Sequence, residues 1–263
     1  MGMASLYSLF ATLLFYFQLL LFVFCVLVAS AAGLAASPLL ALVRRRPAAN
    51  WIAAQVLRVL AEQVLGVAVD VDGTEHLAHA RVQPCIIVAN HQSLLDVVWL
   101  ACVLPHRTVV VANMFIAHLP VLGWFMRLAG NLFVRQGDKL SIKALFDGAL
   151  RSLEHDRVSV VLFPEGRRNG GSESLLEFKK GAFYLAYCTH VPIIPIAVQS
   201  TRALYSWSDR RFCRNAVIRM RVLPPIATQS LAEEDIPALI SSTRNDIQKA
   251  CIALSSPAHA HQQ

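Results

Sequence analysis

The sequence predicts an α/β domain built around a largely parallel central sheet flanked by helices, preceded by a hydrophobic N-terminal helix or helix pair. Three observations support this prediction. From residue 67 onward, short apolar stretches alternate with stretches of helical periodicity. The first 43 residues contain no Asp, Glu, Lys, Arg or His. The chain has 263 residues, 56% of them hydrophobic and only 16% charged, which excludes a disordered chain and a small disulfide-rich scaffold.

The N-terminal segment, residues 1–43, is interpreted as a membrane anchor. Its longest apolar run covers residues 6–28 and exceeds the roughly 20 residues that a spanning helix needs. Residues 29–43 contain Gly33 and Pro38 and are rich in small side chains, so they could form a second, returning leg of a hairpin. A cleaved signal peptide is the competing interpretation, which the long apolar run and the uncharged N-terminus disfavour.

Three consecutive basic residues, Arg44, Arg45 and Arg46, follow the apolar segment, whereas no basic side chain precedes it. By the positive-inside rule, this asymmetry places the main domain on the cytosolic face of a membrane. The formal net charge of +7 favours anionic lipids or phosphorylated substrates as partners. Nucleic acid is not expected as a partner, because the basic residues are dispersed and no zinc-finger spacing occurs.

A basic and amphipathic connector, residues 44–66, joins the anchor to the domain. Apolar residues recur at helical spacing over residues 50–66, which predicts an amphipathic helix lying on the membrane or on the domain. A strand over residues 67–71 and a buried strand over residues 85–89 then open the domain.

The remaining part of the domain, which extends to residue 254, alternates strands and helices as a parallel sheet requires. We expect strands near residues 108–111, 132–134, 158–163, 193–198 and 216–222. We expect helices near residues 93–103, 113–129, 139–154, 178–189 and 233–254. The polar residues 255–263 are expected to form a flexible tail.

The segment at residues 114–128, within the expected helix 113–129, is more apolar than a surface helix should be. It contains Phe115, Trp124 and Phe125, and Pro120 predicts a kink. Two interpretations stay open: a core helix, or an interfacial segment that beds the domain in lipid.

The six cysteines are widely spaced and form no C-x-x-C pair. They are expected to be free and mostly buried thiols in a reducing compartment. The nine histidines show no H-E-x-x-H or related spacing, so the sequence predicts no metal site.

The first candidate site is NHQSLLD at residues 90–96, directly after a buried strand. Open α/β sheets bind ligands at such strand ends. Because positions five apart lie about 140° apart on a continuous helix, His91 and Asp96 can meet only if His91 precedes the helix and Asp96 begins it. Such a pair suits a general base acting on a hydroxyl. The alternative is a capping His with a surface Asp, and Ser93 or Asn90 could cap the helix.

The second candidate site is FPEGRRNGG at residues 163–171, which follows another buried strand. Glycine N–H groups and arginine side chains suit an anion such as phosphate. Glu165 is expected to hold one of the neighbouring arginines, and Lys179 and Lys180 bring further cations. A solvated charged turn is the alternative interpretation.

Two shorter segments complete the set. GNLFVR at residues 130–135 is a short strand that ends in Arg135. VPIIPI at residues 191–196 is a strand whose prolines lack ladder donors, which predicts an edge strand or a shaped wall.

Together the four segments resemble, in order, the motifs of the glycerolipid acyltransferase family, and within it the 1-acyl-sn-glycerol-3-phosphate acyltransferases. NHQSLLD is similar to the family's N-H-x-x-x-x-D block, FPEGRRN to F-P-E-G-T-R, GNLFVR to G-x-x-F-I-D-R and VPIIPI to V-P-I-x-P. Two departures stand out. Arg167 replaces the usual Thr, and Arg135 and Gln136 occupy the aspartate and arginine positions of the third block, so Arg135 matches only with a one-residue slip.

The resemblance implies that a fatty acyl group moves from acyl-CoA, or from acyl carrier protein in bacteria, to the sn-2 hydroxyl of lysophosphatidic acid, giving phosphatidic acid. It implies that His91 is the base and that Asp96 orients it. It implies no cofactor, no metal and no covalent acyl-enzyme. The implied phosphate pocket consists of Arg135, Glu165, Gly166, Arg168 and Lys180. The implied location is a phospholipid membrane, that of the endoplasmic reticulum in a eukaryote or the inner membrane in a bacterium.

Three other functions stay open from the sequence. One is an acyltransferase acting on another lysophospholipid or on glycerol 3-phosphate. Another is a non-catalytic membrane protein that binds lipid. The last is a hydrolase, which would need Ser93 as its nucleophile although the chain has no G-x-S-x-G turn there.

Overall fold

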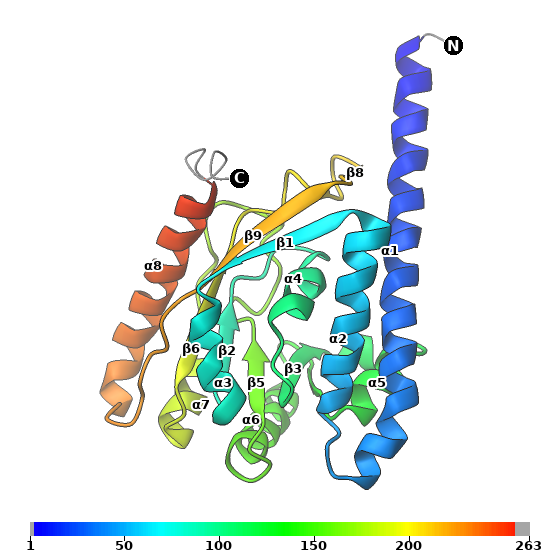
Figure 1. The fold of residues 1–263 in the computed structure, drawn as a ribbon. Coiled ribbons are helices and arrows are strands. Elements are labelled where there is room, and N and C mark those ends of the chain that lie inside the picture. The colour runs from blue at the N-terminus through cyan, green and yellow to red at the C-terminus, as the bar shows by residue number, and fades with distance from the viewer. Residues whose placement is uncertain (1–2, 256–263) are drawn as a thin grey trace.

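A computed structural model of the chain describes residues 3–255, and residues 256–263 of the expected tail lie outside the described residues (Figure 1). The strands are β1 (Val67–Asp72), β2 (Ile86–Ala89), β3 (Thr108–Asn113), β4 (Leu132–Val134), β5 (Ser159–Leu162), β6 (Ile193–Val198), β7 (Tyr205–Ser206), β8 (Arg211–Phe212) and β9 (Ala216–Val222). The α-helices are α1 (Met3–Leu42), α2 (Ala48–Leu60), α3 (Ala78–Val82), α4 (Asp96–Val103), α5 (Leu122–Leu128), α6 (Lys139–Glu154), α7 (Gly181–Thr189) and α8 (Ile236–Ser255). The short helices are η1 (Ala61–Leu65), η2 (Thr74–Leu77), η3 (Met114–His118) and η4 (Glu233–Asp235).

The central sheet has seven strands in the order β1-β9-β6-β2-β5-β3-β4. Neighbouring strands pair in parallel except β6 and β9, which are antiparallel. The structure therefore confirms the predicted α/β fold with a largely parallel sheet. The strands β7 and β8 form a separate antiparallel hairpin.

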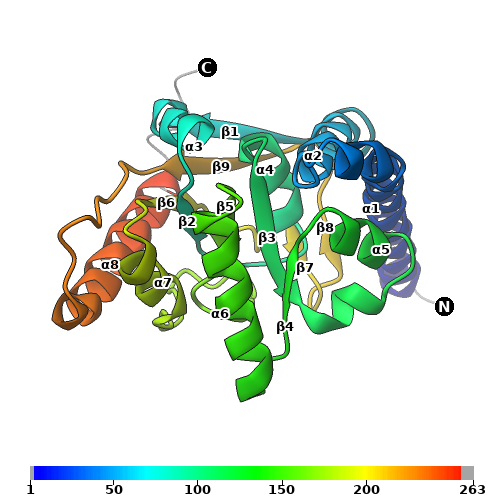
Figure 2. The same cartoon turned by 90° about the horizontal axis from the view of Figure 1, so that it is seen from below.

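Helices cover both faces of the sheet (Figure 2). The alternation of side chains along β2 shows the two faces, because Ile87 and Ala89 join one hydrophobic cluster and Ile86 and Val88 join the other. The helices α1, α2 and α4 contribute to the first cluster, and α6, α7 and α8 contribute to the second. Both faces of the central strands are therefore buried, which explains why they are apolar at every position.

The helix α1 runs without interruption through Gly33 and Pro38. Of the two possibilities for the anchor, the structure therefore has the single helix, and residues 29–42 continue it instead of forming a returning leg. The chain turns only after α1 ends, and α2 runs back along α1 (Figure 1). Packing explains the continuity, since a Cβ added at Gly33 would overlap the ring of Phe125 in α5. This glycine marks a close contact between helices rather than a break.

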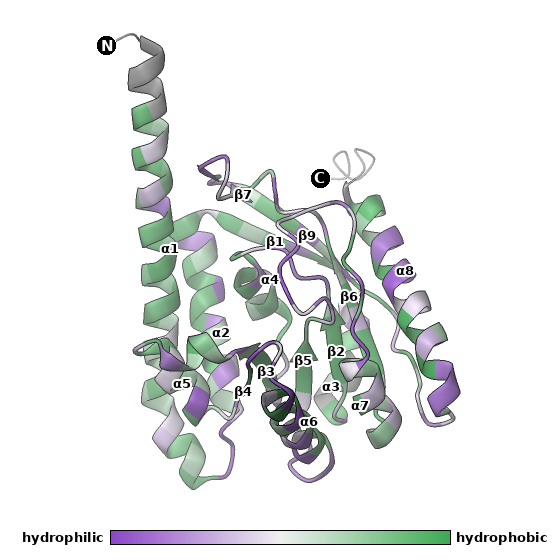
Figure 3. Cartoon of the chain, turned by 180° about the vertical axis from the view of Figure 1, so that it is seen from behind, coloured by the Kyte–Doolittle hydropathy of each residue, from purple (hydrophilic) through white to green (hydrophobic). Residues whose placement is uncertain are grey.

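Within the described residues, one helix is long and apolar enough to cross a membrane, over Leu9–Leu42. One side of it belongs to the domain core, where Phe15 and Phe22 are buried. The opposite side exposes large apolar side chains, among them Phe10 and Phe17, which are 67% and 59% exposed. Figure 3 shows α1 as hydrophobic over most of its length, in contrast to the mixed surface of α8.

The segment predicted as a kinked helix over residues 113–129 forms two helices, η3 and α5. The core interpretation holds for one face of this segment, and lipid contact at the other face stays a prediction. Phe125 of α5 is buried in a cluster with residues of α1 and α2. Phe115 and Trp124 are 67% and 56% exposed, so the segment also presents an apolar outer face.

The prolines of the VPIIPI segment predicted an edge strand or a shaped wall. The structure instead places β6 inside the sheet, between β2 and β9, with all six residues buried. The carbonyl of Pro195 accepts a hydrogen bond from Leu223 N at 2.9 Å, one residue beyond the end of β9. The N–H that proline lacks would point to the same side of the strand. On that side β9 has already ended, so an N–H at residue 195 would have no ladder partner. Proline therefore costs the sheet little stability at this position.

Candidate active site

Three neighbouring strands, β6, β2 and β5, bring the candidate motifs together. NHQSLLD follows the C-terminal end of β2, and FPEGRRNGG begins at the C-terminal end of β5. Because β2 is parallel to both neighbours, these segments and the loop after β6 meet at one edge of the sheet. This is the place where open α/β sheets bind their ligands.

His91 and Asp96 form the contact that the sequence predicts. His91 lies in the turn before α4 and Asp96 is the first residue of that helix. His91 Nδ1 lies 2.6 Å from Asp96 Oδ2. Because the ionised carboxylate can only accept, Nδ1 carries the hydrogen and Nε2 is the basic nitrogen of the ring.

The carboxylate of Asp96 is held by three further donors. Oδ2 also accepts from the backbone N–H groups of Gln92 at 2.7 Å and Ser93 at 3.1 Å, and Oδ1 accepts from Trp99 Nε1 at 3.1 Å. The residue is only 3% exposed. These donors satisfy a buried charge and fix its position, so the imidazole of His91 meets a rigid partner.

Two aromatic residues support the pair, and no role was predicted for either of them from the sequence. The ring of Phe163 stacks on the ring of His91 with centroids 4.2 Å apart and an interplanar angle of 24°. The buried Trp99 meets Phe163 edge-on at 6.1 Å. A signal was present for Trp99, because it follows Asp96 by three residues and therefore lies on the same face of α4.

The turn is also anchored to the end of β6. Asn90 Nδ2 donates to Val198 O, and Val198 N donates to Asn90 Oδ1, both at 2.9 Å. Gln92 Nε2 donates to Val198 O at 2.7 Å and to Gln199 O at 2.8 Å, and its Oε1 accepts from Thr201 N at 2.7 Å. Asn90 therefore ties two strands together and does not cap α4, as the sequence had suggested it could.

The hydroxyl of Ser93 has hydrogen-bond partners other than His91. It lies 3.0 Å from Thr201 Oγ1 and accepts from Leu95 N at 3.2 Å. The residue is 7% exposed, and among the described residues its hydroxyl forms no hydrogen bond with His91. This arrangement disfavours a hydrolase in which Ser93 is the nucleophile, because such a hydroxyl must contact its base.

Glu165 binds backbone groups and not the arginine that the sequence led us to expect. Oε1 accepts from His91 N at 2.8 Å and Oε2 accepts from Leu176 N at 2.9 Å. Neither oxygen forms an ion pair with an arginine in the part of the chain that the structure describes. Because the side chain is buried at 2% exposure, it reaches backbone donors inside the domain while Arg167 and Arg168 extend into solvent.

The electrostatic environment of Glu165 is unusual for a surface loop. Burial raises the pKa of its carboxyl group above the ordinary value, and the charge of Asp96 acts in the same direction. The hydrogen bonds from His91 N and Leu176 N and the charge of His91 act in the opposite direction. Glu165 therefore belongs to the framework of the site.

The glycine of the second motif is close to a cation. Gly166 has φ +71°, and a Cβ added there would lie 2.6 Å from Lys179 Nζ. The side-chain amide of Gln136 donates to Gly166 O. The structure thus places Lys179 beside this glycine, whereas Lys180 lies at the start of α7 and is exposed.

Arg168 lies on a second part of the site. It lines a cavity of about 740 Å³ together with Arg202, with Leu19 and Val23 of α1, and with Trp207. Arg135 is exposed, and its backbone N–H donates to Ser141 Oγ at 2.8 Å. Of the five expected phosphate-pocket residues, the structure joins Glu165 directly to the turn of His91, with Gly166 next to it in the same loop, and places Arg168 at the cavity. Arg135 and Lys180 are exposed, and their membership of the pocket stays a prediction.

All six cysteines are free. Burial raises the pKa of the Cys85 and Cys102 thiols to about 11 and that of the Cys251 thiol to about 12. Thiolates are therefore scarce at neutral pH at these three positions. Among the described residues, no group of three or more His, Cys, Asp or Glu residues is arranged to hold a metal ion.

Comparison with known proteins places this site in a family. The family model described as Acyltransferase matches residues 68–199. The chain is 38% identical over 208 residues to 1-acyl-sn-glycerol-3-phosphate acyltransferase alpha of Mus musculus, covering 78% of this chain and 71% of the mouse protein. It is 34% identical over 216 residues to 1-acyl-sn-glycerol-3-phosphate acyltransferase of Saccharomyces cerevisiae, covering 82% and 70%.

A solved structure has the same fold. The crystal structure of the 1-acyl-sn-glycerophosphate (LPA) acyltransferase PlsC from Thermotoga maritima superimposes with a TM-score of 0.71 over 97% of this chain and 98% of that one, at 22% sequence identity. The segment that matches the family model, residues 68–199, includes the turn of His91, the loop of Glu165 and the strand β6. On the family match and the identity to these relatives, the chain belongs to the acyltransferase family, among the 1-acyl-sn-glycerol-3-phosphate acyltransferases.

Proposed function

We propose that this protein transfers a fatty acyl group to the sn-2 hydroxyl of 1-acyl-sn-glycerol 3-phosphate and so makes phosphatidic acid. The observation that carries the proposal is the buried His91–Asp96 pair at the strand ends, 2.6 Å apart, in a chain related to enzymes of that name. A base whose tautomer is fixed by a carboxylate suits the deprotonation of a hydroxyl.

In this mechanism His91 Nε2 takes the proton of the acceptor hydroxyl. The oxygen attacks the carbonyl carbon of an acyl thioester, a carbon–oxygen bond forms, and the carbon–sulfur bond breaks. The proton passes from the imidazolium to the departing thiolate. Asp96 stabilises the imidazolium, and the stack with Phe163 holds the ring in place. The chain reacts in one transfer step, without an acyl-enzyme.

For the acceptor phosphate, we propose Arg168 as the principal ligand, because it lines the cavity beside the site and a guanidinium suits a phosphate. The backbone at Gly166 and the cations Lys179 and Lys180 would complete the pocket. The exposed Arg135 would add a further cation, and Glu165 serves as a positioning residue because both of its oxygens already accept hydrogen bonds.

The acyl donor is proposed to be a thioester, with acyl-CoA as the first candidate and acyl carrier protein as the second. Leu19 and Val23 of α1 line the cavity that contains Arg168. An apolar wall beside a guanidinium suits a lysophospholipid, whose chain and phosphate need opposite environments. The cavity therefore favours a lipid acceptor over glycerol 3-phosphate, which has no chain.

We further propose that the protein works at a membrane surface with its catalytic domain on the cytosolic side. The exposed apolar faces of α1 and of the segment with Phe115 and Trp124 support lipid contact. These elements pack against each other, so their apolar faces can share one lipid surface. The run of arginines after α1 supports the cytosolic orientation.

The proposal is tested with the full chain purified in detergent. Radiolabelled acyl-CoA is offered with lysophosphatidic acid, lysophosphatidylcholine or glycerol 3-phosphate, and the products are separated. We expect phosphatidic acid from the first acceptor only, and at least a 100-fold lower rate for His91→Ala. His155→Ala, an exposed histidine at the end of α6, is the matched control. Full activity of a folded His91→Ala protein would overturn the mechanism, and a different preferred acceptor would overturn the substrate.

A further inference from the structure

A second cavity lies at the opposite edge of the sheet from His91. Its volume is about 950 Å³, and it is formed by the turn between α1 and α2, the loop before β3 and the loop before β5. Arg107 directly precedes β3 and Val158 directly precedes β5. The length of the strands, roughly 15 Å, therefore separates this cavity from the strand ends that carry the catalytic turn.

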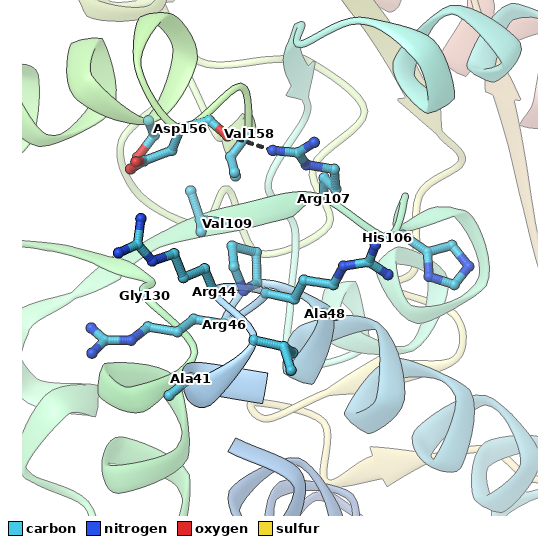
Figure 4. A pocket seen from close by; sticks show the side chains of 14 residues that line it. Ala41, Arg44, Arg46, Ala48, His106, Arg107, Val109, Gly130, Asp156 and Val158 are labelled. Carbon is cyan, nitrogen blue, oxygen red and sulfur yellow. Dashed lines mark hydrogen bonds between the residues drawn. The ribbon is translucent and has the colours of Figure 1, made fainter. Parts of the chain in front are cut away.

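The lining of this cavity is strongly cationic (Figure 4). Arg44, Arg45 and Arg46 come from the turn after α1, and Arg107 comes from the loop before β3. Asp156 is the only acidic residue among the described residues that line it. The guanidinium of Arg107 donates to the backbone carbonyl of Asp156 at 2.6 Å. Four guanidinium groups and one carboxylate therefore line the cavity.

The backbone of Arg44 has a strained conformation. The residue has φ +56°, a left-handed conformation that favours glycine. Arg45 N donates to Leu40 O at 2.7 Å and Arg44 N donates to Ala41 O at 3.1 Å, which is the hydrogen-bond pattern of a helix end that usually contains glycine. Arg44 therefore occupies a strained position at the mouth of the basic turn.

The surroundings of the arginines are apolar on the side of α1. Leu39, Leu42 and Val43 are 68%, 81% and 54% exposed, and they immediately precede the basic turn. Exposed leucines beside a group of guanidiniums match the boundary between lipid chains and phosphate headgroups.

We propose that this cavity binds a phosphate group, carried by the headgroup of an anionic phospholipid or free in solution. Guanidinium groups pair with two phosphate oxygens at once, and the cavity offers four of them from two separate loops. Binding here would orient the end of the α1–α2 hairpin at a membrane. The site is separate from the one at which the acceptor lipid would react.

The test uses the full chain in two forms. In the site variant, Arg44→Gly and Arg46→Gln remove two charges, and glycine also relieves the left-handed backbone, so the protein should unfold at the same temperature or higher. In the matched control, Lys143→Gln and Lys249→Gln remove two charges from the exposed surfaces of α6 and α8. Binding and thermal stability thus move in opposite directions if the proposal is correct.

Two arms distinguish the source of the phosphate. The first measures co-sedimentation with phosphatidylcholine vesicles that contain or lack phosphatidylglycerol, and we expect the site variant to lose about 30-fold in affinity for the anionic vesicles. The second measures the thermal shift of the detergent-solubilised protein with inorganic pyrophosphate. A loss in the first arm alone assigns a lipid headgroup, and a loss in the second assigns free phosphate. Equal binding by parent and site variant in both arms, or an equal loss in the lysine control, would overturn the proposal.

Discussion

The backbone N–H of His91 donates to Glu165 Oε1 at 2.8 Å, across 74 residues of sequence. The second oxygen of the same carboxylate binds Leu176 N. One buried side chain therefore fixes the turn of His91 to the loop that carries Arg168. The two motifs form a single unit, and changes in either should affect both.

Replacing Glu165 by Gln should weaken this link in a pH-dependent way. Burial raises the pKa of Glu165 above its ordinary value of 4.5. Such a group stabilises the folded protein below pH 4.5, and this contribution is lost as the pH rises through the pKa that the group has in the folded protein. The amide has no such dependence, so the destabilisation of Glu165→Gln relative to the parent should shrink as the pH rises from 4.5 toward neutrality. Urea unfolding over this range measures it, and a difference that grows with pH would contradict the assignment.

Trp99→Phe should slow the reaction without weakening substrate binding. The change removes the hydrogen bond from Nε1 to Asp96 Oδ1 and keeps most of the buried ring. A hydrogen bond to a charged group contributes about 1.5 kcal/mol or more, so kcat should fall about tenfold while KM stays unchanged. Trp124→Phe, on the exposed side of α5, is the control. A rise in KM at constant kcat would show that Trp99 does not act through Asp96.

Two glycines in one loop provide a matched pair. Gly166 and Gly170 both have φ +71°, so alanine should destabilise the fold at each position by about 1 kcal/mol. Only at Gly166 does the added Cβ meet Lys179, since nothing lies within 4 Å of it at Gly170. Gly170 lines the Arg168 cavity, but its added Cβ meets no other atom, so Gly166→Ala should raise KM for lysophosphatidic acid more than Gly170→Ala does. Equal KM values in steady-state assays would remove Lys179 and the Gly166 loop from the phosphate pocket.

The buried thiols should resist alkylation until the protein unfolds. Burial raises the pKa of Cys85 to about 11 and that of Cys251 to about 12. At pH 8 iodoacetamide should leave both unmodified in the native protein and modify both in urea, as peptide mass spectrometry would show. Above pH 9 the unfolded chain gains from ionising these thiols, so stability should fall as the pH approaches 11. Rapid native-state modification of either thiol would contradict its burial.

The sequence predicted the parts of the site that depend on local geometry. A five-residue separation brings His91 and Asp96 together only when a turn precedes the helix, and the structure has that turn. The bounds of β4, β6 and β9 also match the expected strands. These features follow from apolar runs and strand ends, which local sequence determines.

The parts that failed depend on distant contacts. Gly33 and Pro38 suggested a break in the N-terminal helix, but packing against α2 and α5 keeps α1 continuous. The place of β6 inside the sheet depends on where β9 ends, more than 20 residues later. The hydrogen-bond partners of Glu165 depend on the burial of its side chain, and burial cannot be deduced from the charged sequence around it. The assignment of Arg135 to the phosphate pocket stays a prediction, because it depends on one residue of register after a three-residue strand.

The packing of α1 also determines how this protein can be prepared. Phe15 stacks on Tyr205 and meets Trp207 edge-on, Phe22 packs against Phe212, and Arg210 donates to Thr12. A version cut back to the first arginine would expose the core beneath the β7–β8 hairpin and open one wall of the Arg168 cavity. Deleting the hydrophobic segment, the usual way to obtain a soluble catalytic fragment, would here remove part of the enzyme itself.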